Sequence, residues 1–183
     1  KTVLVSAIDK NHILAGGDKT EKIEIIPLCV EGSGRATFIE PHNRNIIFIG
    51  KLDYEPNNDA LLYFIDNIYK HLVKQENQIS FRIIGKNPSK ELQKLTIAYD
   101  SIFLCGYVED LQDETSKAFC SVAPMVSGSG MQTKILDAME YGLPVMTTII
   151  GYGDFNFKIG KEICVATNDH NYINQILELF KNN

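Results

Sequence analysis

Short apolar runs rich in β-branched residues alternate with segments of helical periodicity from Asn45 to the end of the chain. The runs are NIIFIG (45–50), ISFRIIG (79–85), SIFLCG (101–106), SVAPMV (121–126), PVMTTII (144–150) and ICVAT (163–167). Helices are predicted between and after them, at 56–75, 88–99, 110–119, from near Gly130, and at 169–180. Buried strands joined by helical crossovers predict an α/β fold, a Rossmann-like doubly wound parallel sheet of about six strands with helices on both faces.

Two helix starts carry polar residues that are typical of N-caps. Asn57 or Asn58 is expected to cap the first long helix, and Asp110 the helix at 110–119. The neighbouring pair Glu109 and Asp110 could also be a pair of catalytic acids, but capping is the simpler interpretation of Asp110.

Residues 1–44 have a different pattern. The apolar runs TVLVSAI and IEIIPLCV are followed by the polar, turn-rich stretch EGSGRATFIEPHNRN. We therefore divide the chain into a lead-in and linker (1–44) and one regular domain (45–183).

Charge and hydropathy exclude several classes of partner. The 18 Lys and Arg residues are outnumbered by 23 Asp and Glu, so the net charge of -5 creates no general attraction for nucleic acid or an anionic membrane. The four histidines have no metal-ligand spacing, and no metal site is expected. No apolar stretch is long enough to span a membrane and no signal peptide opens the chain, which favours a cytoplasmic location.

The loop and helix in VSGSGMQTKILDAMEYGLPV (126–145) follow a predicted strand, at the carboxyl-end edge where such sheets bind ligands. Gly128 and Gly130 allow the backbone to approach a ligand closely, and the helix N-terminus favours an anion. Helical spacing places Lys134 and Asp137 on one face, a cation suited to phosphate and a carboxylate suited to sugar hydroxyls. An ordinary loop followed by a solvated Lys-Asp pair explains the same residues equally well.

Two common glycine motifs do not fit this stretch. A P-loop has Gly before its Lys and Ser or Thr after it, whereas Thr133 and Ile135 flank Lys134. A dinucleotide fingerprint would follow the first regular strand, where only Gly50 and Lys51 stand.

Four motifs, taken in order, carry a more specific resemblance. GSGMQTKILDAMEYGLPVMTT, IIFIGKLDYEPNNDALLYF, FRIIGKNP and IFLCGYVEDL resemble segments of the donor-binding domain of group 1 (family 4) glycosyltransferases of GT-B fold. The similarity covers about residues 45–180, and VLVSAIDK is similar to the last strand and helix of that family's N-terminal half.

The resemblance implies a donor site made of ten residues: Gly50, Lys51, Tyr107, Val108, Gly128, Ser129, Gly130, Met131, Lys134 and Asp137. The two lysines would contact the diphosphate, and the backbone of residues 128–131 would approach the phosphates or the donor sugar. Asp137 would hold the ribose hydroxyls, while Tyr107 and Val108 would lie where the base is read. Ser129 stands where the family's paired-acid motif has its first glutamate.

The function implied by the resemblance is donor binding in a retaining, metal-independent glycosyltransferase of hexosyltransferase type. The full-length protein would transfer a sugar from a nucleoside diphosphate sugar, a substrate rather than a cofactor, to a saccharide or lipid-linked acceptor in polysaccharide biosynthesis. The acceptor would bind an N-terminal domain of the same protein, a lipid-linked acceptor would place the full-length enzyme at the inner face of the membrane, and this chain alone would be inactive. The alternative is a non-catalytic nucleotide-binding or interaction module of Rossmann-like fold.

Overall fold

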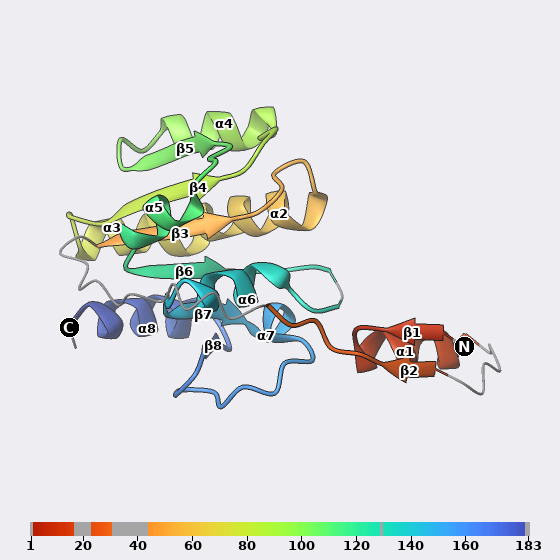
Figure 1. Cartoon of the computed structure of the whole chain (residues 1–183). Coiled ribbons are helices and arrows are strands. Elements are labelled where there is room, and N and C mark those ends of the chain that lie inside the picture. The colour runs from red at the N-terminus through yellow and green to blue at the C-terminus, as the bar shows by residue number, and fades with distance from the viewer. Residues whose placement is uncertain (1, 17–22, 31–43, 129, 182–183) are drawn as a thin grey trace.

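The computed structural model describes residues 2–16, 23–30, 44–128 and 130–181, which contain a six-stranded and a two-stranded parallel sheet (Figure 1). The larger sheet has the order β5-β4-β3-β6-β7-β8. Its strands are β3 (Asn45–Ile49), β4 (Ser80–Ile84), β5 (Ile102–Gly106), β6 (Cys120–Ala123), β7 (Val145–Thr148) and β8 (Cys164–Ala166). This architecture confirms the predicted doubly wound sheet.

The chain winds outward from β3 in two directions. It runs first through β4 to the edge strand β5, then returns to β6 on the other side of β3 and continues through β7 to β8. The helices of this winding are α2 (Glu55–Phe64), α3 (Lys70–Gln75), α4 (Lys90–Ile97), α5 (Leu111–Ser116), α6 (Thr133–Glu140), α7 (Ile149–Tyr152) and α8 (Asp169–Lys181). The strand order therefore reverses between β3 and β6, which is the position where doubly wound sheets bind ligands.

Each face of the large sheet has its own apolar core. Ile46 and Phe48 of β3 pack with residues of α2, α3 and α8, whereas Ile47 packs with residues of α6 on the opposite face. Side chains alternate across a strand, so a strand covered on both faces must be apolar at successive positions. That requirement explains why NIIFIG has no polar alternation.

The helix predicted at 56–75 contains an irregularity that the sequence pattern did not show. A π-helical turn, η1 (Ile65–Tyr69), separates α2 from α3, although all three pack against the same core. The N-cap position is Tyr54, which makes no side-chain cap hydrogen bond, so neither Asn57 nor Asn58 is the cap. Asp110 does cap its helix, accepting a hydrogen bond from the backbone N–H of Gln112 at 2.8 Å.

The run PVMTTII ends as a strand earlier than predicted. The hydroxyl of Thr148 accepts a hydrogen bond from the backbone N–H of Gly151 (3.1 Å) and thereby caps the short helix α7. Ile149 and Ile150 belong to this helix and are exposed. At these two isoleucines, the hydrogen bond that caps α7 outweighed the preference of a β-branched side chain for a strand.

The N-terminal segment forms a small unit beside the large sheet (Figure 1). Strands β1 (Thr2–Leu4) and β2 (Ile23–Ile25) pair in parallel, and α1 (Ala7–Ala15) lies between them in sequence with Ser6 as its N-cap. Most of the stretch predicted as a linker, residues 31–43, is outside the described part of the chain.

Candidate functional site

The reversal of strand order brings two loops together at the carboxyl edge of the sheet. Gly50 and Lys51 follow β3, and the glycine loop, residues 126–131, follows β6. These two segments are far apart in sequence but adjacent at the switch point, as the sequence predicted for a ligand site.

The ends of β3 and β4 approach each other very closely. A Cβ on Gly85 would lie 1.9 Å from the carbonyl oxygen of Gly50 and 2.8 Å from Cγ of Leu52. The backbone N–H of Gly50 donates to the carbonyl of Ile84 at 3.0 Å, which continues the pairing beyond the strand. The close packing at the ends of β3 and β4 therefore requires a glycine at position 85. The sequence pattern alone did not single out Gly85.

The glycine loop uses backbone conformations that L-residues rarely adopt. Gly128 has φ of 107° and Gly130 has φ of 76°. A Cβ on Gly128 would lie 3.6 Å from Cβ of Pro56, so the loop rests against the first turn of α2. Ser129 lies outside the described residues, and its predicted role stays a prediction.

Helix α6 begins at Thr133, three residues later than predicted, because Gly130 and Met131 belong to the loop. Gln132 occupies the N-cap position in an extended conformation, and its side chain makes no cap hydrogen bond to the backbone N–H groups of the first turn. Its side chain instead accepts a hydrogen bond from Lys134 Nζ at 2.9 Å. The N-terminal end of α6 thus faces the switch point beside a lysine.

Lys134 is held by neutral groups. Its Nζ donates to Oδ1 of Asn57 (2.7 Å) and Oε1 of Gln132 (2.9 Å), and it lies 3.4 Å from Sδ of Met125. Burial lowers the pKa of Lys134 to about 8, against a smaller opposing effect of Asp137. No ion pair of the described residues includes Lys134. The site therefore contains a partly desolvated cation without a close anionic partner.

Asn57 connects the two predicted lysines, although the sequence analysis expected it only as a possible cap. Its Nδ2 donates to the backbone carbonyl of Lys51 (2.8 Å), and its Oδ1 accepts from Lys134. A buried asparagine in the first turn of a helix is easily mistaken for a cap, because only the tertiary structure shows which groups it bonds.

Asp137 lies one turn after Lys134 on α6 and is partly buried. Burial and the nearby Glu140 raise the pKa of Asp137, and Lys134 opposes this shift. The cation and the carboxylate that the sequence predicted on one helix face therefore lie one turn apart on α6. The carboxylate is less exposed than that of an ordinary surface aspartate.

Lys51 is far more exposed than Lys134: 74% of its side chain is exposed, and its Nζ pairs with Oδ1 of Asp53 at 3.6 Å. The structure does not bring the two lysine side chains into contact. Asn57 links the two residues, because its side chain bonds to the backbone carbonyl of Lys51 and to Nζ of Lys134.

A cavity of about 420 Å³ lies at the carboxyl ends of β3, β4 and β5. Four predicted residues line it: Gly50, Lys51, Tyr107 and Val108. Lys86 also lines it, with its Nζ 4.0 Å from the centre of the Tyr107 ring. Tyr107 is 65% exposed, so most of its side chain stays accessible to solvent although Lys86 lies over the ring.

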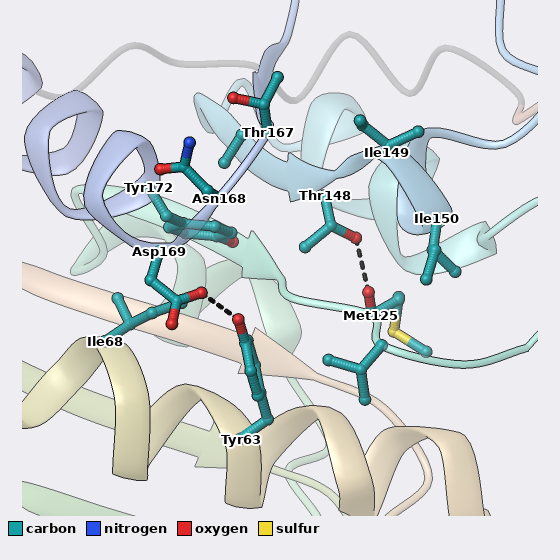
Figure 2. Close-up of a pocket in the computed structure, with 12 residues that line it drawn as sticks. Tyr63, Ile68, Met125, Thr148, Ile149, Ile150, Thr167, Asn168, Asp169 and Tyr172 are labelled. Carbon is teal, nitrogen blue, oxygen red and sulfur yellow. Dashed lines mark hydrogen bonds between the residues drawn. The ribbon is translucent and has the colours of Figure 1, made fainter.

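A second cavity, of about 390 Å³, lies between α2, α8 and the ends of β6, β7 and β8. Figure 2 shows Tyr63 of α2 pointing toward Asp169 at the start of α8, to which its hydroxyl donates a hydrogen bond. Thr148 donates to the carbonyl of Met125 (2.6 Å) on the opposite wall (Figure 2). None of the predicted site residues that the structure describes lines this cavity.

Two further properties bear on the chemistry. In the part of the chain that the structure describes, no three His, Cys, Asp or Glu side chains come together where they could hold a metal ion. Among the described helices, none is both long and apolar enough to cross a membrane.

Comparison with known families gives a match to the model of the glycosyl transferases group 1 over residues 43–182. A relative from Klebsiella pneumoniae, an uncharacterized 44.6 kDa protein in the cps region, is 29% identical over 149 residues. That alignment covers 77% of this chain and 38% of the relative, so the chain spans well under half of the relative's length.

Solved glycosyltransferase structures share the fold. An S. aureus TarM complex with UDP superposes with a TM-score of 0.79 at 20% identity, over 98% of this chain and 36% of that one. Anabaena HepE in complex with UDP-glucose gives 0.79 at 14% identity, over 98% and 54%. The pneumococcal O-GlcNAc transferase GtfA, in complex with UDP and GlcNAc, gives 0.66 at 21% identity, over 98% and 38%.

Proposed function

Because this chain belongs to the glycosyl transferases of group 1, we propose that it forms the half of such an enzyme that binds a nucleoside diphosphate sugar. The observation that carries the proposal is Lys134, a partly buried cation held by two neutral amides at the switch point of the sheet. A buried charge is costly without a counter-charge, and a bound diphosphate supplies one.

The neighbouring features fit the other parts of such a ligand. The cavity lined by Val108, Lys86 and the Tyr107 ring has room for a base, and the exposed ring offers a stacking surface. Asp137, one turn along α6 from Lys134, is suited to accept hydrogen bonds from ribose hydroxyls. UDP is the nucleotide we favour, because UDP is bound in the TarM, HepE and GtfA complexes.

Within this proposal the chain's contribution to catalysis is electrostatic. Lys134, Lys51 and the N-terminal end of α6 would neutralise the charge that develops on the leaving diphosphate. We propose that these groups take the place of a metal ion and that the anomeric configuration of the sugar is retained. The residues described here provide no group that we assign as a base or nucleophile.

The exposed surface of the small N-terminal unit favours the proposal that the same protein has a partner domain. Val3, Leu14 and Ile26 of this unit are all at least 45% exposed, which is a large apolar surface for a two-stranded sheet with one helix. We propose that β1, α1 and β2 belong to an acceptor-binding half and that a saccharide or a lipid-linked saccharide binds there.

The substitution Lys134→Ala tests the donor site. We expect UDP, titrated into the isotope-labelled chain, to perturb the NMR signals of Gly128, Gly130 to Lys134 and Lys51. Lys134→Ala should weaken UDP binding by roughly 1 to 3 kcal/mol, the range for a charge-assisted contact.

The matched control is Lys94→Ala, which removes an exposed lysine from the last turn of α4, at the end of that helix that leads to the amino end of β5. It should bind UDP as the unaltered chain does. Signals that move only elsewhere, or equal affinity for the two variants, would reject this donor site.

A further inference from the structure

Asn57 is buried, with 4% of its surface exposed, and both ends of its amide are bonded to parts of the candidate site. Nδ2 donates to the carbonyl of Lys51 at 2.8 Å, and Oδ1 accepts from Nζ of Lys134 at 2.7 Å. One side chain thus joins the loop after β3 to helix α6, across the point where strand order reverses.

The surroundings leave little freedom for this side chain. A Cβ on Gly50 would lie 3.0 Å from Nδ2 of Asn57, so the absence of a side chain at Gly50 makes room for the amide. On the other side, Pro56 abuts Gly128 of the glycine loop. The first turn of α2 is therefore wedged between the two loops that form the site.

The neutrality of the amide matters as much as its geometry. A carboxylate at this position would form a buried ion pair with Lys134 and neutralise it before any ligand arrives. The other oxygen that accepts a hydrogen bond from Lys134 Nζ is also an amide oxygen, Oε1 of Gln132. Asp137 is the charged group whose field reaches Lys134, and burial outweighs its effect on the lysine.

We propose that Asn57 is a positioning residue of the donor site, which fixes Lys134 and the Lys51 backbone with one uncharged side chain and so leaves the lysine charge to the ligand. This inference rests on the proposed function for the identity of the ligand. It concerns a residue that need not touch the nucleotide.

The substitution Asn57→Asp keeps the shape of the side chain and adds a negative charge. In a chain labelled with ¹³C-lysine, the NMR titration midpoint of Lys134 should rise by more than about one pH unit, because an opposite charge replaces a neutral oxygen. The affinity for UDP should fall by about tenfold, since the diphosphate must compete with the new carboxylate.

Asn67→Asp is the matched control. Asn67 lies in η1, and its Nδ2 also donates to a backbone carbonyl, that of Tyr63, at 3.0 Å. The same charge change there should leave both the Lys134 titration and the UDP affinity as they are in the unaltered chain.

An unchanged Lys134 titration in folded Asn57→Asp, or equal loss of UDP affinity in both variants, would overturn the positioning role. If Asn57→Asp does not fold, Asn57→Ser serves, because its short hydroxyl cannot reach both partners: the Lys134 signals must shift and UDP must bind more weakly. Should UDP fail to bind the unaltered chain, the proposed function fails, whereas the Lys134 titration still decides the role of Asn57.

Discussion

Lys134 illustrates how single contacts decide the properties of a residue. Two amide oxygens satisfy its hydrogen-bonding groups but supply no negative charge, and burial lowers its pKa to about 8. The alternative interpretation of the sequence was a solvated surface lysine in an i, i+3 pair with Asp137. Such a lysine would have neither the two amide contacts nor the lowered pKa. The lysine is consequently sensitive to pH in a range where its ligand is not.

Affinity for UDP should therefore fall by about tenfold between pH 7 and pH 9. The protonated lysine attracts the diphosphate. When the pH exceeds the Lys134 pKa of about 8, the free chain must therefore take up a proton on binding. A phosphate with its second pKa near 6 is already about nine-tenths ionised at pH 7, so its charge changes little over this range. Isothermal titration calorimetry in buffers of different ionisation enthalpy measures both the affinity and the proton uptake.

Lys134→Arg is the control for this titration, because a guanidinium keeps its charge at pH 9. Its affinity at pH 7 need not match that of the lysine, but the affinity should no longer change with pH. A pH dependence of the same size in Lys134→Arg would show that another group is responsible.

At the level of elements, α1 is attached to the large domain through its N-terminus. The carboxylate of Asp154, just after α7, accepts hydrogen bonds from the Ser6 hydroxyl (2.5 Å) and the backbone N–H of Ile8 (2.8 Å). Burial raises the pKa of Asp154, but the bonds from Ser6, Ile8 and Ala7 together hold it below its usual value. A carboxylate from one unit thus serves as a second cap for a helix of the other.

Asp154→Asn should loosen α1 without loosening the large sheet. Loss of a charged cap costs about 1 kcal/mol at a solvent-accessible site, so the backbone amides of Ile8 and Asp9 should exchange hydrogen about fivefold faster. Hydrogen exchange followed by NMR measures both regions in one experiment. Because the folded pKa is lowered, the same loosening should appear in the unaltered chain as the pH falls below about 4.

Asp113→Asn is the comparison, since Asp113 is an acid on α5 whose partner Lys117 lies in the same region. Its α1 amides should exchange as in the unaltered chain. Protection of α1 that is equal in Asp154→Asn and Asp113→Asn would mean that the carboxylate does not hold the helix in place.

For the whole molecule, the residues of the proposed donor site all lie in one of the two units of the chain. Lys134, Asp137 and the cavity at Tyr107 all belong to the six-stranded domain, and the small unit with α1 contacts that domain at Asp154. A Cβ on Gly130 would lie 3.5 Å from Oδ2 of Asp9, which shows how near α1 lies to the glycine loop.

We expect the 183-residue chain to bind UDP but not to transfer sugar. Holding two reactants in geometry can supply about 7 to 11 kcal/mol of a barrier, and the small N-terminal unit is too short to position an acceptor. The measurement is sugar transfer from a panel of UDP-sugars to saccharide and lipid acceptors, by this chain and by the full-length gene product. Equal turnover by both would require a complete active site within these residues.

Much of the molecule was determined by the sequence itself. Successive apolar residues in NIIFIG and ISFRIIG could only be accommodated in strands buried on both faces, so the doubly wound parallel sheet was predictable. The sequence also predicted a ligand site at the switch point, where such sheets bind ligands, and the structure places Lys51 and Lys134 beside that point; the site itself stays a prediction. These features depend on patterns that are local or that follow from general rules of topology.

Only the tertiary structure decided which side chains complete the site. Asn57 and Lys134 are 77 positions apart, and no periodicity relates an amide at the start of α2 to a lysine on α6. The start of α6 at Thr133 and the end of β7 before Ile149 depended on hydrogen bonds that compete with local propensity. The sequence thus specified the sheet and the edge that carries the site, whereas packing between distant segments specified the charge, burial and orientation of its residues.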